Sequence, residues 1–142
     1  MNNHTPKRQS ISLRNRSSDS KMLSDLLTAY AKSFNISDES YNDLRLIVEE
    51  VFINITSYAG MDDEQSIKIE LDRTPTEINV TFTDSGIAFN PLTDATECQE
   101  TDGHCDGGMG IHIIMSLTDS QEYNRIEQRN VFTVTKHYTR SK

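Results

Sequence analysis

The sequence lacks any apolar run of the roughly 18 residues that a membrane-spanning helix needs. Its first ten residues, MNNHTPKRQS, also lack the apolar stretch of a secretory signal peptide. Basic residues are few: 14 Lys and Arg stand against 22 Asp and Glu, and the net charge is −8. An acidic chain is a poor partner for nucleic acid. We therefore expect a cytoplasmic protein that contacts neither membrane nor nucleic acid directly.

Cysteine is scarce too, with only Cys98 and Cys105 in 142 residues. His104 precedes the second cysteine, but two sulfurs and one imidazole do not complete a four-ligand zinc site. A disulfide is unusual in a cytoplasmic protein. We expect both thiols to be reduced and to bind no metal.

A chain of 142 residues has the size of one compact domain. We expect this domain at residues 9–138, with a flexible N-terminal tail at 1–8 and a C-terminal tail at 139–142. Alternating apolar residues predict strands at residues 9–14, 66–73, 77–84, 120–128 and 130–138. Helical spacing of apolar residues predicts helices at residues 21–36, 41–60 and 111–119.

The order of these elements predicts the fold class. A strand and two helices come first, and a hairpin, a loop at residues 90–107, a helix and a last strand pair follow. The turn RTPTE makes the two strands of the hairpin antiparallel neighbours. This order predicts an α/β two-layer sandwich, in which helices cover one face of a mostly antiparallel sheet.

The two long helices each have an apolar stripe. In the first the stripe comprises Met22, Leu23, Leu26, Leu27, Tyr30 and Phe34, and in the second Leu44, Ile47, Val48, Val51, Phe52 and Ile55. At about 100° per residue, Glu50 and Asn54 lie one turn apart beside the second stripe, whereas Glu49 points about 100° away. A carboxylate and a carboxamide facing one space suit Mg²⁺, or a base that positions a hydroxyl group. The alternative is an ordinary solvated helix face.

A second motif, DSGIAFNP at residues 84–91, directly follows a predicted strand. Asp84 at the strand end can accept a hydrogen bond from an exocyclic amine, and Gly86 lets the backbone approach a ligand closely. The alternative is a simple turn that ends the strand.

A third motif, DGGMGIHII at residues 106–114, places three glycines directly before a predicted helix. Backbone N–H groups and the positive end of a helix then meet in one place, which is suited to binding phosphate. The pattern is neither a P-loop nor a dinucleotide-binding GxGxxG after a strand. A flexible glycine hinge is the alternative.

The order of the three motifs is more specific than any one of them. EExxxN on a helix, DxGxxFNP after a strand, a long loop and GGxGIHII at a helix start resemble the N, G1 and G2 boxes of the GHKL (Bergerat-type) ATP-binding fold. The segments VEEVFIN, DSGIAFNPL, GGMGIHIIMSLTD and RNVFTVTK resemble in particular the bacterial anti-sigma-factor serine/threonine kinases. The resemblance covers residues 9–138.

The resemblance implies a role for each motif in binding ATP and Mg²⁺. Glu50 would be the catalytic base, and Asn54 would hold Mg²⁺. Asp84 would bind the adenine amino group beside Gly86, and the phosphates would meet Gly108, Met109 and Gly110.

The resemblance also implies partners and a regulatory role. Such kinases phosphorylate a serine of an anti-anti-sigma (STAS-domain) protein, sequester a sigma factor and form homodimers. We therefore expect an anti-sigma regulatory factor that acts by partner switching.

Two features depart from the family pattern. No Lys or Arg occurs at residues 74–124, and residues 93–106 carry five Asp and Glu instead of a basic lid. Tyr58 stands where the family often has histidine. Phosphoryl transfer depends on cations, so Arg45, Lys68, Arg73, Arg125 or a dimer neighbour would have to reach the site. The alternative function is a non-catalytic nucleotide-binding module in the same kind of regulatory system.

Overall fold

The computed structural model describes residues 8–14, 19–58, 65–94 and 106–141, with the backbone alone at 106–109. Its elements in chain order are β1 (Gln9–Arg14), α1 (Ser20–Ser33), α2 (Asp38–Tyr58), β2 (Ser66–Arg73), β3 (Glu77–Asp84), α3 (Asp106–Leu117), β4 (Ser120–Ile126) and β5 (Arg129–His137). The expectations for Cys98, Cys105 and most of the predicted loop lie outside the described residues.

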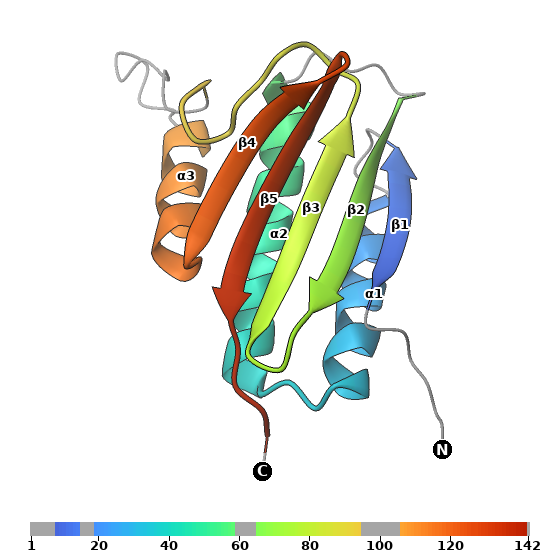
Figure 1. The fold of residues 1–142 in the computed structure, drawn as a ribbon, viewed down its shortest axis with the longest axis vertical. Coiled ribbons are helices and arrows are strands. Elements are labelled where there is room, and N and C mark those ends of the chain that lie inside the picture. The colour runs from blue at the N-terminus through green and yellow to red at the C-terminus, as the bar shows by residue number, and fades with distance from the viewer. Residues whose placement is uncertain (1–7, 15–18, 59–64, 95–105, 142) are drawn as a thin grey trace.

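The strands form one antiparallel sheet in the order β1-β2-β3-β5-β4. The three helices lie against one face of this sheet, with α2 between α1 and α3 (Figure 1). Within the described residues, no helix or strand covers the other face, which we call the outer face (Figure 1). The predicted two-layer α/β sandwich is confirmed.

The core lies between the sheet and α1 and α2. Strand β3 shows the alternation clearly, because Ile78, Val80, Phe82 and Asp84 are buried while the residues between them are half-buried. All six residues of the predicted α2 stripe are buried. The predicted α1 stripe is only partly correct, since Met22 is 50% exposed. None of the described helices is long and apolar enough to span a membrane.

All three helices and the last two strands have bounds that differ from the prediction, and the differences at α3 and β4 have a clear physical reason. Helix α3 begins at Asp106 and not at residue 111, so its glycines lie inside the first turns. Glycine disfavours a helix by about 1 kcal/mol, so packing against α2 has to offset this. Strand β4 ends at Ile126, because Glu127 and Gln128 adopt positive φ angles of 49° and 68° and form a tight turn. The sequence lacks the Asn-Gly or Asp-Gly signal that usually marks such a turn.

The expected C-terminal tail is attached to the domain at residues 139–141. The backbone N–H of Ser37 donates to Thr139 O at 2.9 Å, and the N–H of Thr139 donates to Ser40 Oγ at 2.9 Å. The N–H of Ser141 donates to Asn35 O, also at 2.9 Å. These bonds hold the connection between α1 and α2 at the lower end of the sheet, where both β5 and the described chain end (Figure 1).

The difference between the two helix stripes can be tested by truncation. Ile47 is fully buried, so Ile47→Ala should lower the free energy of unfolding by about 2–5 kcal/mol. Met22→Ala should change it by no more than about 0.5 kcal/mol, because that side chain is half exposed. Urea denaturation of both variants measures these changes. Equal losses would show that Met22 belongs to the core after all.

Candidate functional site

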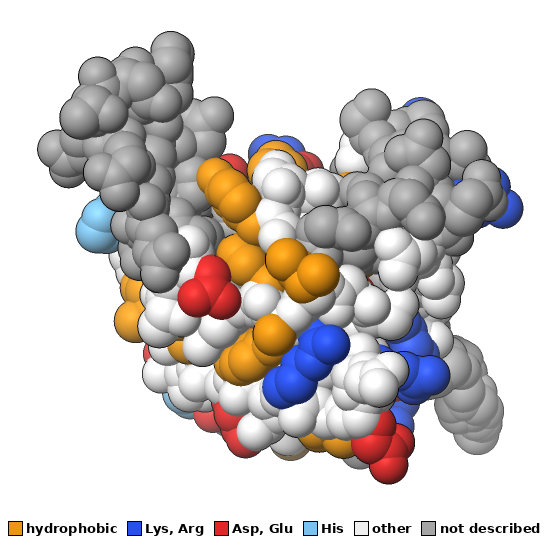
Figure 2. Space-filling view, turned by 90° about the horizontal axis from the view of Figure 1, so that it is seen from above, with side chains coloured by type: hydrophobic (Ala, Val, Ile, Leu, Met, Phe, Trp, Pro, Cys, Tyr) orange, Lys and Arg blue, Asp and Glu red, His pale blue; other side chains and the backbone are white. Residues whose placement is uncertain are grey.

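The residues predicted to bind a ligand lie at one end of the molecule, the upper end in Figure 1. Helix α2 ends there, α3 begins there, and the segment after β3 crosses between them (Figure 1). Figure 2 looks onto this end and shows hydrophobic side chains gathered at its centre. Tyr58, Ile87 and Ile126, which are 40%, 61% and 51% exposed, all belong to segments at this end.

Helix α3 packs directly on the polar face of α2. A Cβ atom placed on Gly110 would lie 2.7 Å from Glu50 Oε1, 3.4 Å from Asn54 Nδ2 and 3.7 Å from Asn54 Oδ1. Only a residue without a side chain permits this approach. The structure thus brings together three residues that the sequence placed in two separate motifs. We call Glu50, Asn54 and Gly110 the α2–α3 cluster.

Asn54 is buried and incompletely satisfied. It is 2% exposed, and its Nδ2 atom has no hydrogen-bond partner among the described residues. A buried polar group without a partner costs about 1–3 kcal/mol, so it calls for an explanation such as a missing ligand. A polar ligand at the α2–α3 cluster fits this requirement. The carboxamide also offers an oxygen ligand of the type that Mg²⁺ prefers.

Glu49 points away from this cluster, as helix geometry predicted. Arg45 Nη1 donates to Glu49 Oε2 at 3.1 Å one turn earlier in α2, and both side chains are 40% exposed. The adjacent glutamates therefore face different surroundings, and Glu50 is the one that lies against α3.

Asp84 ends β3 as a buried carboxylate, 3% exposed. Its Oδ1 atom accepts hydrogen bonds from the backbone N–H of Gly86 at 2.8 Å and from Asn130 Nδ2 at 2.9 Å. Neither bond uses Oδ2. The turn therefore fixes the carboxylate and leaves one oxygen to accept a hydrogen bond from a ligand, as an adenine amino group requires.

Sequence reasoning missed Asn130, which organises this turn. Asn130 is 3% exposed, and its Nδ2 atom also donates to Ile87 O at 2.7 Å. Its Oδ1 atom accepts from the N–H of Phe89 at 3.0 Å and from the hydroxyl of Tyr123. Asn130 is the cross-strand partner of Asp84. A polar residue at an inward-facing position of β5 was the available signal.

An aromatic pair connects α2 to the same turn. The Tyr58 and Phe89 rings stack with centroids 5.6 Å apart and planes at 23°. Phe89 is buried, whereas Tyr58 is partly exposed and belongs to the last turn of α2. This stack places an exposed aromatic face beside the turn that holds Asp84.

Four cations were expected as candidates to serve the site, and two of them pair on other surfaces. Arg45 bonds Glu49 on the far side of α2. Lys68 lies 3.7 Å from Glu70 on the outer face of the sheet.

The other two cations are also engaged elsewhere. The Arg73 guanidinium lies 3.8 Å from the centroid of the Phe34 ring and donates to the Tyr138 hydroxyl at 3.3 Å, near the lower end of the sheet. Arg125 Nη1 donates to Gly86 O at 2.8 Å, so it supports the turn after β3. None of the four has a contact with the α2–α3 cluster among the described residues.

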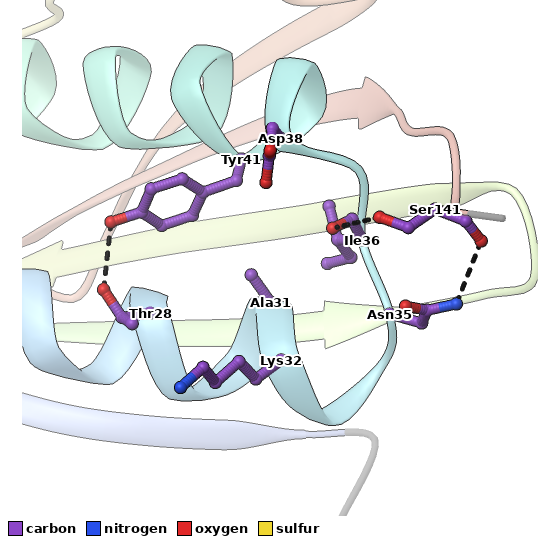
Figure 3. Close-up of a pocket in the computed structure, with 8 residues that line it drawn as sticks. All are labelled: Thr28, Ala31, Lys32, Asn35, Ile36, Asp38, Tyr41 and Ser141. Carbon is purple, nitrogen blue, oxygen red and sulfur yellow. Dashed lines mark hydrogen bonds between the residues drawn. The ribbon is translucent and has the colours of Figure 1, made fainter.

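A cavity of about 350 Å³ lies at the opposite end of the helices (Figure 3). It lies between the last turn of α1 and the first turn of α2. A bond of 2.9 Å between the Thr28 and Tyr41 hydroxyls bounds one side, and Asn35 Nδ2 donating to Ser141 O at 3.0 Å bounds the other (Figure 3). This cavity contains none of the residues that the three motifs predicted.

Comparison with known proteins assigns the chain to a family. The family of histidine kinase-like ATPase domains matches residues 14–136, and the chain belongs to it. A search of curated proteins gives no significant match. Among solved structures, the nucleotide-free catalytic domain of the histidine kinase ThkA aligns over 94% of this chain and 99% of its own, with 14% identity and a TM-score of 0.48.

The role of Asn130 can be tested by its removal. Asn130→Ala should lower the free energy of unfolding by about 1–3 kcal/mol, because the buried N–H of Phe89 and the Asp84 carboxylate each lose a partner. Asn124→Ala is the matched control on the same hairpin, where the side chain is exposed, and should change it by less than about 0.5 kcal/mol. Urea denaturation decides, and similar losses for both variants would contradict this role.

Proposed function

We propose that this protein is an ATP-dependent serine/threonine kinase and anti-sigma regulatory factor. It phosphorylates an anti-anti-sigma (STAS-domain) partner and sequesters a sigma factor in the cytoplasm, as a homodimer. The observation that supports this proposal most is the α2–α3 cluster, in which a carboxylate, an unsatisfied carboxamide and a glycine from separate motifs meet. The family of histidine kinase-like ATPase domains adds support for the use of ATP.

In this proposal the second motif (residues 84–91) binds the adenine and the third motif (residues 106–114) binds the phosphates. Asp84 accepts a hydrogen bond from the adenine amino group through its unused oxygen, and Gly86 lets the base approach the backbone. The exposed face of Tyr58 offers a surface on which a flat ring can stack. The phosphates meet the backbone of Gly108, Met109 and Gly110 in the first turns of α3, where N–H groups and the helix dipole favour anions.

In the proposed transfer, Glu50 accepts the proton of the substrate serine as the serine oxygen bonds the terminal phosphorus of ATP. The bond from that phosphorus to the bridging oxygen breaks, and ADP leaves with the electron pair. Mg²⁺, when bound, neutralises charge on the phosphates. Asn54 is the residue that would hold Mg²⁺, and its burial beside Gly110 fixes the carboxamide for that task.

One observation favours a second candidate function, a non-catalytic nucleotide-binding module in a partner-switching system. Arg45, Lys68, Arg73 and Arg125 all lie away from the α2–α3 cluster or are held by other groups. Transfer needs a cation to neutralise the charge that develops on the transferred phosphate, whereas binding of a nucleotide does not need it at that position. The two candidates share the same nucleotide contacts and differ in whether phosphate reaches a partner.

Glu50 separates the two candidates. With Mg-ATP and a cognate STAS-domain protein, intact mass should show wild-type transfer, and Glu50→Ala should slow it by roughly 10²–10⁴-fold with nucleotide affinity kept. Glu49→Ala is the matched control and should change little, because Glu49 pairs with Arg45. Asn54→Ala should lose both binding and transfer. Nucleotide binding without any wild-type transfer would establish the module, and an essential Glu49 would contradict the assigned base.

Gly110 tests the closeness of the two helices. An Ala side chain there would lie 2.7 Å from Glu50 Oε1, so the end of the Glu50 side chain must move while the backbone can stay. Gly110→Ala should therefore keep the thermal midpoint within a few degrees and lower the transfer rate at least about tenfold, a rise of about 1.4 kcal/mol in the barrier. Ser116→Ala, on an exposed part of α3, is the control. Unchanged transfer in Gly110→Ala would contradict the arrangement.

A further inference from the structure

The outer face of the sheet carries a pocket of about 270 Å³, whose lining shares only Asp84 with the proposed nucleotide site. Its lining residues are Ser12, Ser66, Lys68, Thr83, Asp84, Ser85 and Arg129. We call this the outer-face pocket. The lining residues come from β1, β2, β3 and β5 and from the residue directly after β3, so the pocket is built from segments far apart in the sequence.

The sheet register explains why these side chains meet. Lys68 pairs with Ser12 on one side and with Thr83 on the other, so the three side chains share one face of the sheet. Phe82 and Asp84 are buried toward the helices, which turns Thr83 to the outer face. The pocket therefore lies on the opposite side of β3 from the α2–α3 cluster, at the same end of the strands.

The chemistry of the lining is cationic and rich in hydroxyl groups. Lys68 and Arg129 lie on either side of β3, and four serine and threonine side chains lie with them in the lining. In the lower half of Figure 2, the side of the outer face, Lys and Arg side chains lie in two places, one near the centre and one at the right, and an acidic side chain lies below them. The chain as a whole carries a net charge of −8, so two cations in one pocket lining form a local positive region on an acidic protein.

The carboxylates near the pocket leave Lys68 and Arg129 able to bind an anion. Lys68 lies 3.7 Å from Glu70, but their side chains are 52% and 27% exposed, and such a pair contributes little. Arg129 forms no ion pair within the described part of the chain. Asp84 reaches the pocket lining, yet its Oδ1 atom is bonded to Gly86 and Asn130 on the helix side of the sheet.

We propose that the outer-face pocket binds a phosphate group, as free phosphate or as a phosphomonoester. Such a group carries up to two negative charges and accepts several hydrogen bonds, which matches two cations and four hydroxyl donors. The guanidinium of Arg129 can bind two of its oxygens at once. The volume of about 270 Å³ suits a phosphate with a short substituent. The pocket shares Asp84 with the proposed nucleotide site, but its cations and hydroxyl groups lie outside that site, so the proposal does not depend on the kinase function.

The test is an NMR titration of the full chain, at constant ionic strength, with inorganic phosphate and with O-phosphoserine. We expect saturable shifts at the backbone amides of Ser12, Thr83 and Ser85. Lys68→Ala and Arg129→Ala should each weaken binding about tenfold, as loss of a charged hydrogen-bond donor does. Lys21→Ala, an exposed lysine paired with Asp25, is the control and should not change it. Tighter binding of one of the two ligands identifies the source of the phosphate group.

Four outcomes would overturn the proposal. Shifts confined to α3 amides would place the anion in the nucleotide site, and so would loss of the Thr83 shift in Asn54→Ala. Equal weakening by Lys21→Ala would show attraction to charge alone. Thr83→Val keeps the shape of the side chain and removes its hydroxyl group, so it should weaken binding several-fold in a folded protein; unchanged affinity in this variant would also count against the pocket.

Discussion

The arrangement of this domain depends on how closely α3 approaches α2. The missing side chain at Gly110 lets the α3 backbone lie against Glu50 and Asn54, and a single methyl group would fall 2.7 Å from the glutamate oxygen. Asn54 is buried beside this contact, and within the described part of the chain its amide nitrogen has no partner. A stable core would normally exclude such a group. The contact is therefore better explained by a ligand than by stability.

A second constraint acts across the sheet, where Asp84 on β3 faces Asn130 on β5. Asn130 satisfies the carboxylate and also the backbone of the turn after β3, at Ile87 and Phe89. A fully bonded polar group of this kind fixes its neighbours, because moving any member leaves a buried atom unpaired. These bonds hold the turn in one conformation, so the proposed binding of a nucleotide would need little ordering of these residues.

The sequence predicted local features well and distant ones poorly. Strand alternation located β1, β2 and β3 to the residue, and helix periodicity placed Glu50 and Asn54 on one face and Glu49 on another. The α3 start was missed because glycine argues against a helix unless packing offsets it, and that packing involves residues far away in the chain. Asn130 was missed for a related reason. Its role depends on pairing with Asp84 across the sheet, and the sequence alone does not give the register of β3 and β5.

Strand β3 separates two environments of opposite character at its end. On the helix side, Asp84 is a buried acceptor within a network of neutral donors and Arg125. On the outer face, Thr83 lies between strands that carry Lys68 and Arg129. Alternate residues of one strand point to opposite faces of the sheet. The end of β3 therefore presents the Asp84 carboxylate, an acceptor, to the helix side and the Thr83 hydroxyl, a donor, to the outer face. Lys68 and Arg129 therefore lie on the outer face at this end of the sheet, on the two strands that flank β3.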